Sequence, residues 1–257
     1  MLEQIIAAFS ALPQVEAIAL GGSRAGTHFD EKSDYDIYLY CTDTVCEVVR
    51  RRIYEPLCSY AEIGNRFWET EDNGTFVSGI DFDILFRDLD AFSAGIANVA
   101  EKHIPSNAYT TCMWHNLLTC QILYDRSGRL TAAKTRFDVP YPEQLRQAIL
   151  QRGRRLLYDS MPAYSLQIEK AAARRDLVSI NHRTAAFLET YFDILFALNR
   201  RTHPGEKRLV QLCGQMCPIL PEAFEENLNR LFAHMFTEPE ALVDDLKRIV
   251  DALAKIL

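Results

Sequence analysis

The spacing of apolar residues predicts alternating helices and strands at the start of the chain. From residue 2 to 12, apolar side chains recur every three or four positions, which is typical of a helix with one buried face, and Pro13 then ends it. Short apolar runs bounded by glycine or polar residues are typical of strands. Two such runs follow, from Val15 to Leu20 and from Asp34 to Cys41.

A second helix and a hairpin are predicted next. The helical period returns from Thr44 to Tyr60, where we expect Pro56 to kink or break the helix. The tripeptide Asp72-Asn73-Gly74 then separates two extended segments, Arg66 to Glu71 and Thr75 to Phe86. Asn-Gly between extended segments is a strong hairpin signal, so we expect the turn at this tripeptide.

The remaining pattern is mostly helical. Before residue 139 we expect a helix from Asp88 to His103 capped by Asp88 and Asp90, a helix from Tyr109 to Leu118 and an edge strand from Gln121 to Tyr124. Pro140-Tyr141-Pro142 breaks helices on both sides and is the best candidate for a domain boundary. Beyond it, helices are expected at Glu143 to Tyr158, Tyr164 to Ala173, Asp176 to Asn199, Lys207 to Cys213, Pro221 to His234 and Pro239 to Leu257. The prediction is therefore an α/β (α+β) domain with a small mixed sheet over residues 1–138, followed by an all-helical domain over 139–257.

Composition favours a folded cytoplasmic protein. The 257 residues are 48% apolar, which is ample for packed cores. There is no apolar run of eighteen residues and no basic segment ahead of an apolar one at the N-terminus, so neither a membrane span nor secretion is expected. The seven cysteines are odd in number and scattered, which indicates reduced thiols.

The net charge disfavours a nucleic-acid partner. Lys and Arg total 28 against 35 Asp and Glu, for a net charge of −7. A protein that grips a polyanion needs concentrated positive charge, so a small acceptor fits this balance better than RNA or DNA. The run Arg50-Arg51-Arg52 is expected to be a solvated helix face.

Candidate chemistry gathers between Leu20 and Tyr40. Asp34 and Asp36 head a strand, and alternation directs both carboxylates to the same face. Two like charges on one face repel unless a cation lies between them, and Mg²⁺ prefers such hard oxygen ligands together with substrate phosphates. The turn Gly21-Gly22-Ser23 lets backbone N–H groups, including those of Ser23 and Arg24, approach a phosphate.

The order of apolar strand, Gly22-Ser23, ten residues, Asp34-Tyr35-Asp36 and apolar strand resembles the signature of the polymerase-β-like nucleotidyltransferases. Within that superfamily the chain looks like the small-molecule branch, which includes aminoglycoside and lincosamide nucleotidyltransferases. The resemblance covers about Ala17 to Tyr40. It implies two Mg²⁺ ions and ATP or another nucleoside triphosphate as donor, with Asp34 and Asp36 as ligands of both ions.

The resemblance also implies further site residues. A third metal-binding carboxylate is expected on the strand that ends at Phe86, where alternation puts Asp81 and Asp83 on the same face. Asp83 is preferred because it abuts the apolar run from Ile84 to Phe86, as the third aspartate of the family tends to; Asp81 is the alternative. Gly22, Ser23 and Arg24 would contact phosphates. Lys207 is a candidate for another phosphate contact, and Glu189 for the general base; a helix C-terminus and a solvent-facing helix position explain these two residues as well.

The expected activity is transfer of a nucleoside monophosphate, AMP in the case of ATP, to a hydroxyl of a small acceptor, with release of pyrophosphate. Aminoglycoside-like or lincosamide-like compounds are the implied acceptors, and antibiotic resistance the implied setting. An acidic pocket that included Glu69, Glu71 and Asp72 would suit a cationic aminoglycoside. The alternatives are a non-catalytic module that binds nucleotide or a partner protein, and an antitoxin-like protein adenylyltransferase; a degenerate module would be expected to lose a carboxylate or the glycine turn.

Overall fold

The chain folds into two compact units. The computed structural model describes residues 1–25, 33–67 and 69–257. The first unit comprises Met1–Ala97 and Asn116–Val139, and the second comprises Asn98–His115 and Pro140–Leu257. The chain therefore enters the second unit at residue 98, returns at 116 and enters it again at 140. The functional assignment of the two predicted domains stays a prediction.

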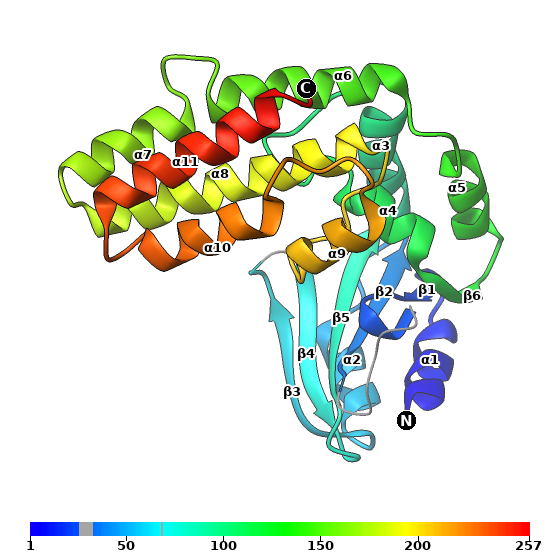
Figure 1. Cartoon of the computed structure of the whole chain (residues 1–257). Coiled ribbons are helices and arrows are strands. Elements are labelled where there is room, and N and C mark those ends of the chain that lie inside the picture. Colours follow the sequence, from blue (N-terminus) through cyan, green and yellow to red (C-terminus); the bar gives the residue numbers. More distant parts are fainter. Residues whose placement is uncertain (26–32, 68) are drawn as a thin grey trace. The chain divides into compact units, whose positions relative to one another are not determined.

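The first unit is built on a six-stranded mixed sheet in the order β3-β4-β5-β2-β1-β6 (Figure 1). Its strands are β1 (Val15–Leu20), β2 (Tyr35–Cys41), β3 (Cys58–Asn65), β4 (Thr70–Phe76), β5 (Asp81–Asp88) and β6 (Gln121–Asp125). β2 and β5 run parallel, whereas the other neighbouring pairs are antiparallel. The predicted α/β class with a mixed sheet, followed by helices, is confirmed, and β6 is the predicted edge strand.

One face of this sheet carries the apolar core of the unit. Ile37 of β2 and Ile84 of β5 are fully buried on this face. They join a cluster with Ile5 and Phe9 of helix α1 (Leu2–Ser10) and Tyr54 of helix α2 (Glu47–Tyr54). Because side chains alternate along a strand, the residues between these positions point to the opposite face. Asp36 of β2 and Asp83 of β5 therefore lie on the face away from α1 and α2.

The predicted hairpin turn at Asp72-Asn73-Gly74 is wrong, because these residues lie inside β4. A Cβ on Gly74 would come within 2.5 Å of the Phe82 ring and 2.7 Å of the Tyr60 carbonyl oxygen, so this glycine serves close strand packing. The hairpin turn lies between β4 and β5 and contains Gly79 at φ 82°.

The predictions on either side of that tripeptide also need correction. The helix expected to reach Tyr60 ends at Tyr54, close to Pro56, and β3 follows from Cys58. The strand expected from Arg66 to Glu71 begins only at Thr70. Local spacing is ambiguous in short, mixed stretches, and pairing with β4 decides the outcome for β3.

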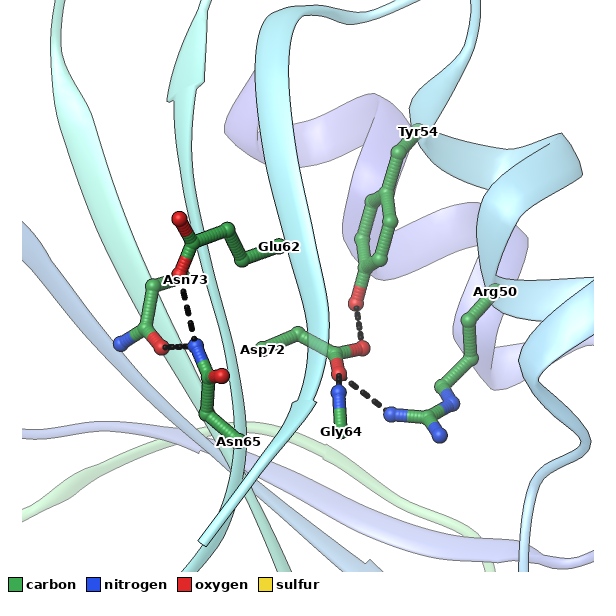
Figure 2. Close-up of polar contacts among 7 residues, drawn as sticks. All are labelled: Arg50, Tyr54, Glu62, Gly64, Asn65, Asp72 and Asn73. Atoms are coloured by element: carbon green, nitrogen blue, oxygen red, sulfur yellow. Dashed lines mark hydrogen bonds and ion pairs between the residues drawn. The ribbon is translucent and has the colours of Figure 1, made fainter. Parts of the chain in front are cut away.

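Arg50 is not on a solvated face, as the sequence suggested, although Arg51 and Arg52 are exposed. Arg50 is only 4% exposed and forms an ion pair with Asp72 of β4, which is fully buried. Asp72 also accepts hydrogen bonds from the Tyr54 hydroxyl (2.7 Å) and the Gly64 backbone N–H (2.8 Å), as Figure 2 shows. Asp72 thus joins α2, β3 and β4 internally and does not line an acidic substrate pocket.

The other helices complete the two units. They are α3 (Leu89–Ala100), α4 (Cys112–Thr119), α5 (Arg129–Phe137), α6 (Glu143–Leu157), α7 (Tyr164–Ala173), α8 (Leu177–Leu198), α9 (Leu209–Met216), α10 (Phe224–His234) and α11 (Pro239–Ala254). In the second unit, α8 packs against α6 and α7, and α11 packs against α7 and α10 (Figure 1). Helix α5 was not predicted. Over the described ranges, no helix has the length and apolar character to cross a membrane.

Candidate functional site

Asp36 and Asp83 stand side by side on the polar face of the sheet. Their Cα atoms are register partners in the parallel pair of β2 and β5. The next pair, Ile37 and Ile84, is buried on the opposite face, so both carboxylates point away from the apolar core. Asp34 lies one residue before β2 and is half-buried. The fold therefore brings two of the three predicted carboxylates level with each other.

The glycine turn lies directly against Asp36. Gly21 donates its backbone N–H to the Asp36 carbonyl oxygen over 2.8 Å. Gly22 has φ 59°, and a Cβ at this position would overlap the Asp36 carboxylate. A Cβ on Gly21 would likewise overlap the ring of Tyr38. Both positions require glycine, because the turn packs on two successive same-face side chains of β2.

The residues after the turn are partly described. Ser23 begins a short 3₁₀ segment, Ser23–Ala25. The predicted hydrogen bond from its hydroxyl group, and the part of the ten-residue spacer from 26 to 32, lie outside the described residues. Arg24 donates from Nε to the backbone carbonyl of Ser33 (2.7 Å), and its guanidinium lies 4.1 Å from the centre of the Tyr35 ring. Arg24 therefore ties the end of the turn to the start of β2.

Asp83 is held by a chain of amides on the neighbouring strands. Asn73 of β4 donates from Nδ2 to Asp83 Oδ1 over 2.7 Å. Asn65 of β3 donates in turn to Asn73 Oδ1 over 2.7 Å and to Glu62 Oε2 over 3.1 Å (Figure 2). Asp81, in contrast, is exposed beside the hairpin turn and accepts a hydrogen bond from Thr75 Oγ1. Register thus separates two aspartates that alternation left equivalent, since Asp83 is the one level with Asp36.

Glu71 of β4 is a further carboxylate on this face; the sequence suggested it only as one member of an acidic acceptor pocket, without a role in the reaction. It is 8% exposed, and burial, followed by the charges of Asp83 and Glu69, raises its pKa. Within the described part of the chain, no donor hydrogen-bonds to its carboxylate. The alternation of Glu69, Glu71 and Asn73 predicts that these side chains share a face. The turn that was expected at Asp72-Asn73-Gly74 hid this pattern.

A buried arginine supports the same face. Arg87 is 7% exposed and binds Glu69 through two hydrogen bonds, of 2.6 and 2.7 Å. Its guanidinium lies 4.2 Å from the centre of the Tyr38 ring, and its Nη1 donates to Asn116 Oδ1 over 2.8 Å. Asn116 Nδ2 donates to the Tyr38 hydroxyl, whose pKa is raised by burial. Since Tyr38 packs on Gly21, this network supports the glycine turn.

The two remaining candidates lie in the second unit. Glu189 is half-buried on α8, where its charge contributes, after burial, to raising the pKa of Tyr109 to about 12. Lys207 is exposed in the turn before α9. The roles expected for these two residues stay predictions.

The acidic side chains on the polar face of the sheet are the candidate metal ligands. No group of three or more His, Cys, Asp or Glu residues within 1–25, 33–67 and 69–257 is arranged to hold a metal ion. Mg²⁺, however, is commonly held by one or two protein carboxylates, with water and phosphate oxygens completing its shell. Asp36 and Asp83 both offer carboxylate oxygens, and they are register partners on neighbouring strands. The residues present therefore fit Mg²⁺.

Comparisons with known proteins give a match to one family model, and the similar structures include the two described here. A model described as a domain of unknown function, DUF4037, matches residues 109–209, less than half of the chain. The comparison with curated proteins found no match. A nucleotidyltransferase-like protein from Exiguobacterium sibiricum has 12% identity and a TM-score of 0.44, with 99% of this chain and 72% of that one covered. An aminoglycoside 6-adenyltransferase from Bacillus subtilis has 11% identity and a TM-score of 0.27, with 98% and 90% covered.

Proposed function

We propose that this protein is a metal-dependent nucleotidyltransferase, which moves a nucleoside monophosphate from a nucleoside triphosphate to a hydroxyl group of a small molecule. The observation that carries the proposal is the packing of the Gly21-Gly22 turn on Asp36, with Asp83 in register beside it. These elements come from two separate stretches of sequence, residues 20–40 and strand β5. Their meeting on the polar face of one sheet gives a phosphate-approach surface next to a pair of carboxylates.

Asp36 and Asp83 are the residues that would hold Mg²⁺, and Asp34, one residue before β2, is the next carboxylate along the chain. When bound, the metal would neutralise phosphate charge and lower the pKa of the attacking hydroxyl. Asn73 fixes the Asp83 carboxylate through its 2.7 Å hydrogen bond, which orients one ligand before substrate arrives. Because Gly22 has no side chain, the Asp36 carboxylate occupies the place that a Cβ would take, and the turn lies directly against that carboxylate.

The acceptor is proposed to be a small hydroxylated compound. The net charge of −7 disfavours a polyanionic acceptor, and the site face is rich in carboxylates. Aminoglycoside-like and lincosamide-like compounds are the first acceptors to test, with ATP as the first donor. Transfer to a protein side chain would be recognised by labelling of a partner protein instead.

The test is release of pyrophosphate from ATP with Mg²⁺ and a panel of hydroxylated acceptors. Wild type should release pyrophosphate only with metal and a suitable acceptor, and Asp36→Asn and Asp83→Asn should each lose at least about 100-fold in rate. Asp43→Asn removes an exposed carboxylate just beyond β2 and serves as the matched control. Asp81→Asn should lose less than Asp83→Asn. Metal-dependent ATP binding without transfer to any acceptor would favour a non-catalytic module.

A further inference from the structure

Glu71 lies on the same face of the sheet as Asp36 and Asp83, on strand β4, which neighbours β5. In the register of β4 and β5, Asn73 stands opposite Asp83 and Glu71 stands opposite Leu85. Tyr38 of β2 is also level with Leu85, so Tyr38, Leu85 and Glu71 form the row next to the Asp36–Asp83 row. Glu71 and Asp83 are therefore diagonal neighbours, whose Cα atoms lie about 7 to 8 Å apart in such sheets.

The environment of Glu71 is unusual for a structural carboxylate. The residue is 8% exposed, and no described residue donates a hydrogen bond to its carboxylate. Its nearest charged influences are Asp83 and Glu69, both acidic, and Glu69 already engages Arg87. A carboxylate with little exposure, acidic neighbours and no partner among the described residues gains no stabilisation from the fold, and such groups gather at functional sites.

The other acidic residues of this strand show the contrast. Asp72 is fully buried, but Arg50, Tyr54 and Gly64 satisfy its carboxylate, and it points to the core face. Glu69 is paired with Arg87. Among the residues that the structure describes, Glu71 therefore differs from both neighbours in having no hydrogen-bond or ion-pair partner, and it faces the site.

We infer that Glu71 is a catalytic residue of the proposed nucleotidyl transfer, and that its carboxylate accepts the proton of the acceptor hydroxyl. The inference rests on the proposed function. As the acceptor oxygen forms its bond to the α-phosphorus, the O–H proton moves to Glu71. The bond between the α-phosphorus and the bridging oxygen breaks, and pyrophosphate leaves with that electron pair. Glu71 then releases the proton to solvent, so the group is restored for the next turnover.

This position suits a base better than a metal ligand. A diagonal neighbour of Asp83 stands beside a metal held by Asp36 and Asp83, where a metal-bound hydroxyl would be within reach of a long side chain. Glutamate provides that reach, because its carboxylate is one methylene further from the backbone than that of aspartate.

The test is Glu71→Gln, which keeps the shape of the side chain and removes its ability to take a proton. We expect kcat for pyrophosphate release to fall at least about 100-fold, while the dissociation constant of ATP with Mg²⁺ stays within about twofold of wild type. The thermal midpoint should be unchanged or higher, since a carboxylate close to the like charges of Asp83 and Glu69 loses its own charge. Glu55→Gln, which removes an exposed charge after α2, is the control for charge alone.

Two results would overturn the inference while the proposed function stands. One is a Glu71→Gln protein that turns over as fast as wild type; the other is one that loses metal-dependent ATP binding, because Glu71 would then be a metal ligand. Glu71→Asp, which withdraws the carboxylate without removing it, should retain more activity than Glu71→Gln, and equal loss in both would contradict the role of proton acceptor. A wild-type protein that neither binds ATP with metal nor releases pyrophosphate would overturn both proposals.

Discussion

Gly22 is the residue at which the turn and β2 come closest. Its φ of 59° is unfavourable for other residues, and a Cβ would also overlap the Asp36 carboxylate. Gly22→Ala should therefore destabilise the protein by about 1 to 3 kcal/mol and weaken ATP binding at least about tenfold. Urea unfolding and isothermal titration calorimetry measure the two effects.

Gly79→Ala is the matched control, because Gly79 has φ 82° but nothing lies within 4 Å of its Cβ position. It should show the backbone cost and no loss of ATP binding. If Gly22→Ala and Gly79→Ala bind ATP equally well, the contact between the turn and Asp36 has no part in the nucleotide site.

Asp193 of α8 gives a prediction about pH. It is 3% exposed and accepts hydrogen bonds from Thr110 N–H (3.0 Å) and Oγ1 (2.7 Å), but burial raises its pKa to about 6. Because the folded pKa lies above the unfolded value of about 3.9, the folded state holds the proton more tightly. The resulting stability is full below about pH 4 and is lost as pH rises through about 6.

The measurement compares wild type with Asp193→Asn, which accepts a hydrogen bond but does not ionise. The free energy of unfolding of wild type should fall relative to the variant by roughly 2 to 3 kcal/mol between pH 4 and pH 7. Parallel pH dependence in the two proteins would show that Asp193 does not titrate in this range.

At the scale of elements, strand β4 joins the core to the candidate site. Its Asp72 ties α2 to the sheet, while Asn73 and Glu71 face the carboxylates on the other side. Asp72→Ala leaves Arg50 buried and unpaired, so we expect a loss of about 3 to 5 kcal/mol in the free energy of unfolding.

The control for this substitution is Asp81→Ala, at the exposed start of β5, which should change stability by about 0.5 kcal/mol or less. Denaturant unfolding measures both variants. An Asp72→Ala protein as stable as wild type would mean that the pair with Arg50 contributes nothing to the fold.

Strand β4 also shows which parts of the fold could be predicted from the sequence and which could not. The runs at Val15–Leu20 and Asp34–Cys41 are apolar and bounded by turn residues, and the structure has strands there. Asn73-Gly74 has the same local appearance as a hairpin turn, and only the contacts of Gly74 with Phe82 and Tyr60 explain its place in a strand. Those contacts join residues that are not adjacent in sequence, so the local sequence pattern could not predict them.

In the candidate site, too, some features could be predicted from the local sequence and others depend on strand pairing. Spacing predicted that the glycine turn and Asp36 belong together, because both lie within one short stretch. The choice between Asp81 and Asp83, the burial of Arg50 and the position of Glu71 all depend on which strands are neighbours and in which register. Register between β2, β4 and β5 is a property of the folded sheet.

At the scale of the whole molecule, charge predicts the class of acceptor. With a net charge of −7, the protein should show no salt-dependent binding to RNA or DNA at protein concentrations up to about 10 μM in 0.1 M salt. Fluorescence anisotropy of labelled oligonucleotides measures this. Binding in the micromolar range that weakens as salt rises would favour a nucleic-acid acceptor over a small molecule.

The central claim is that the face bearing Asp36 and Asp83 holds a nucleoside triphosphate together with a metal. It is tested most directly by isothermal titration of ATP, with and without Mg²⁺, into wild type, Asp36→Asn, Asp83→Asn and the control Asp43→Asn. We predict binding that requires Mg²⁺ in wild type and in Asp43→Asn, and that weakens at least about tenfold in the other two. Absence of binding by wild type with any divalent metal, or equal binding by all four proteins, would contradict the account.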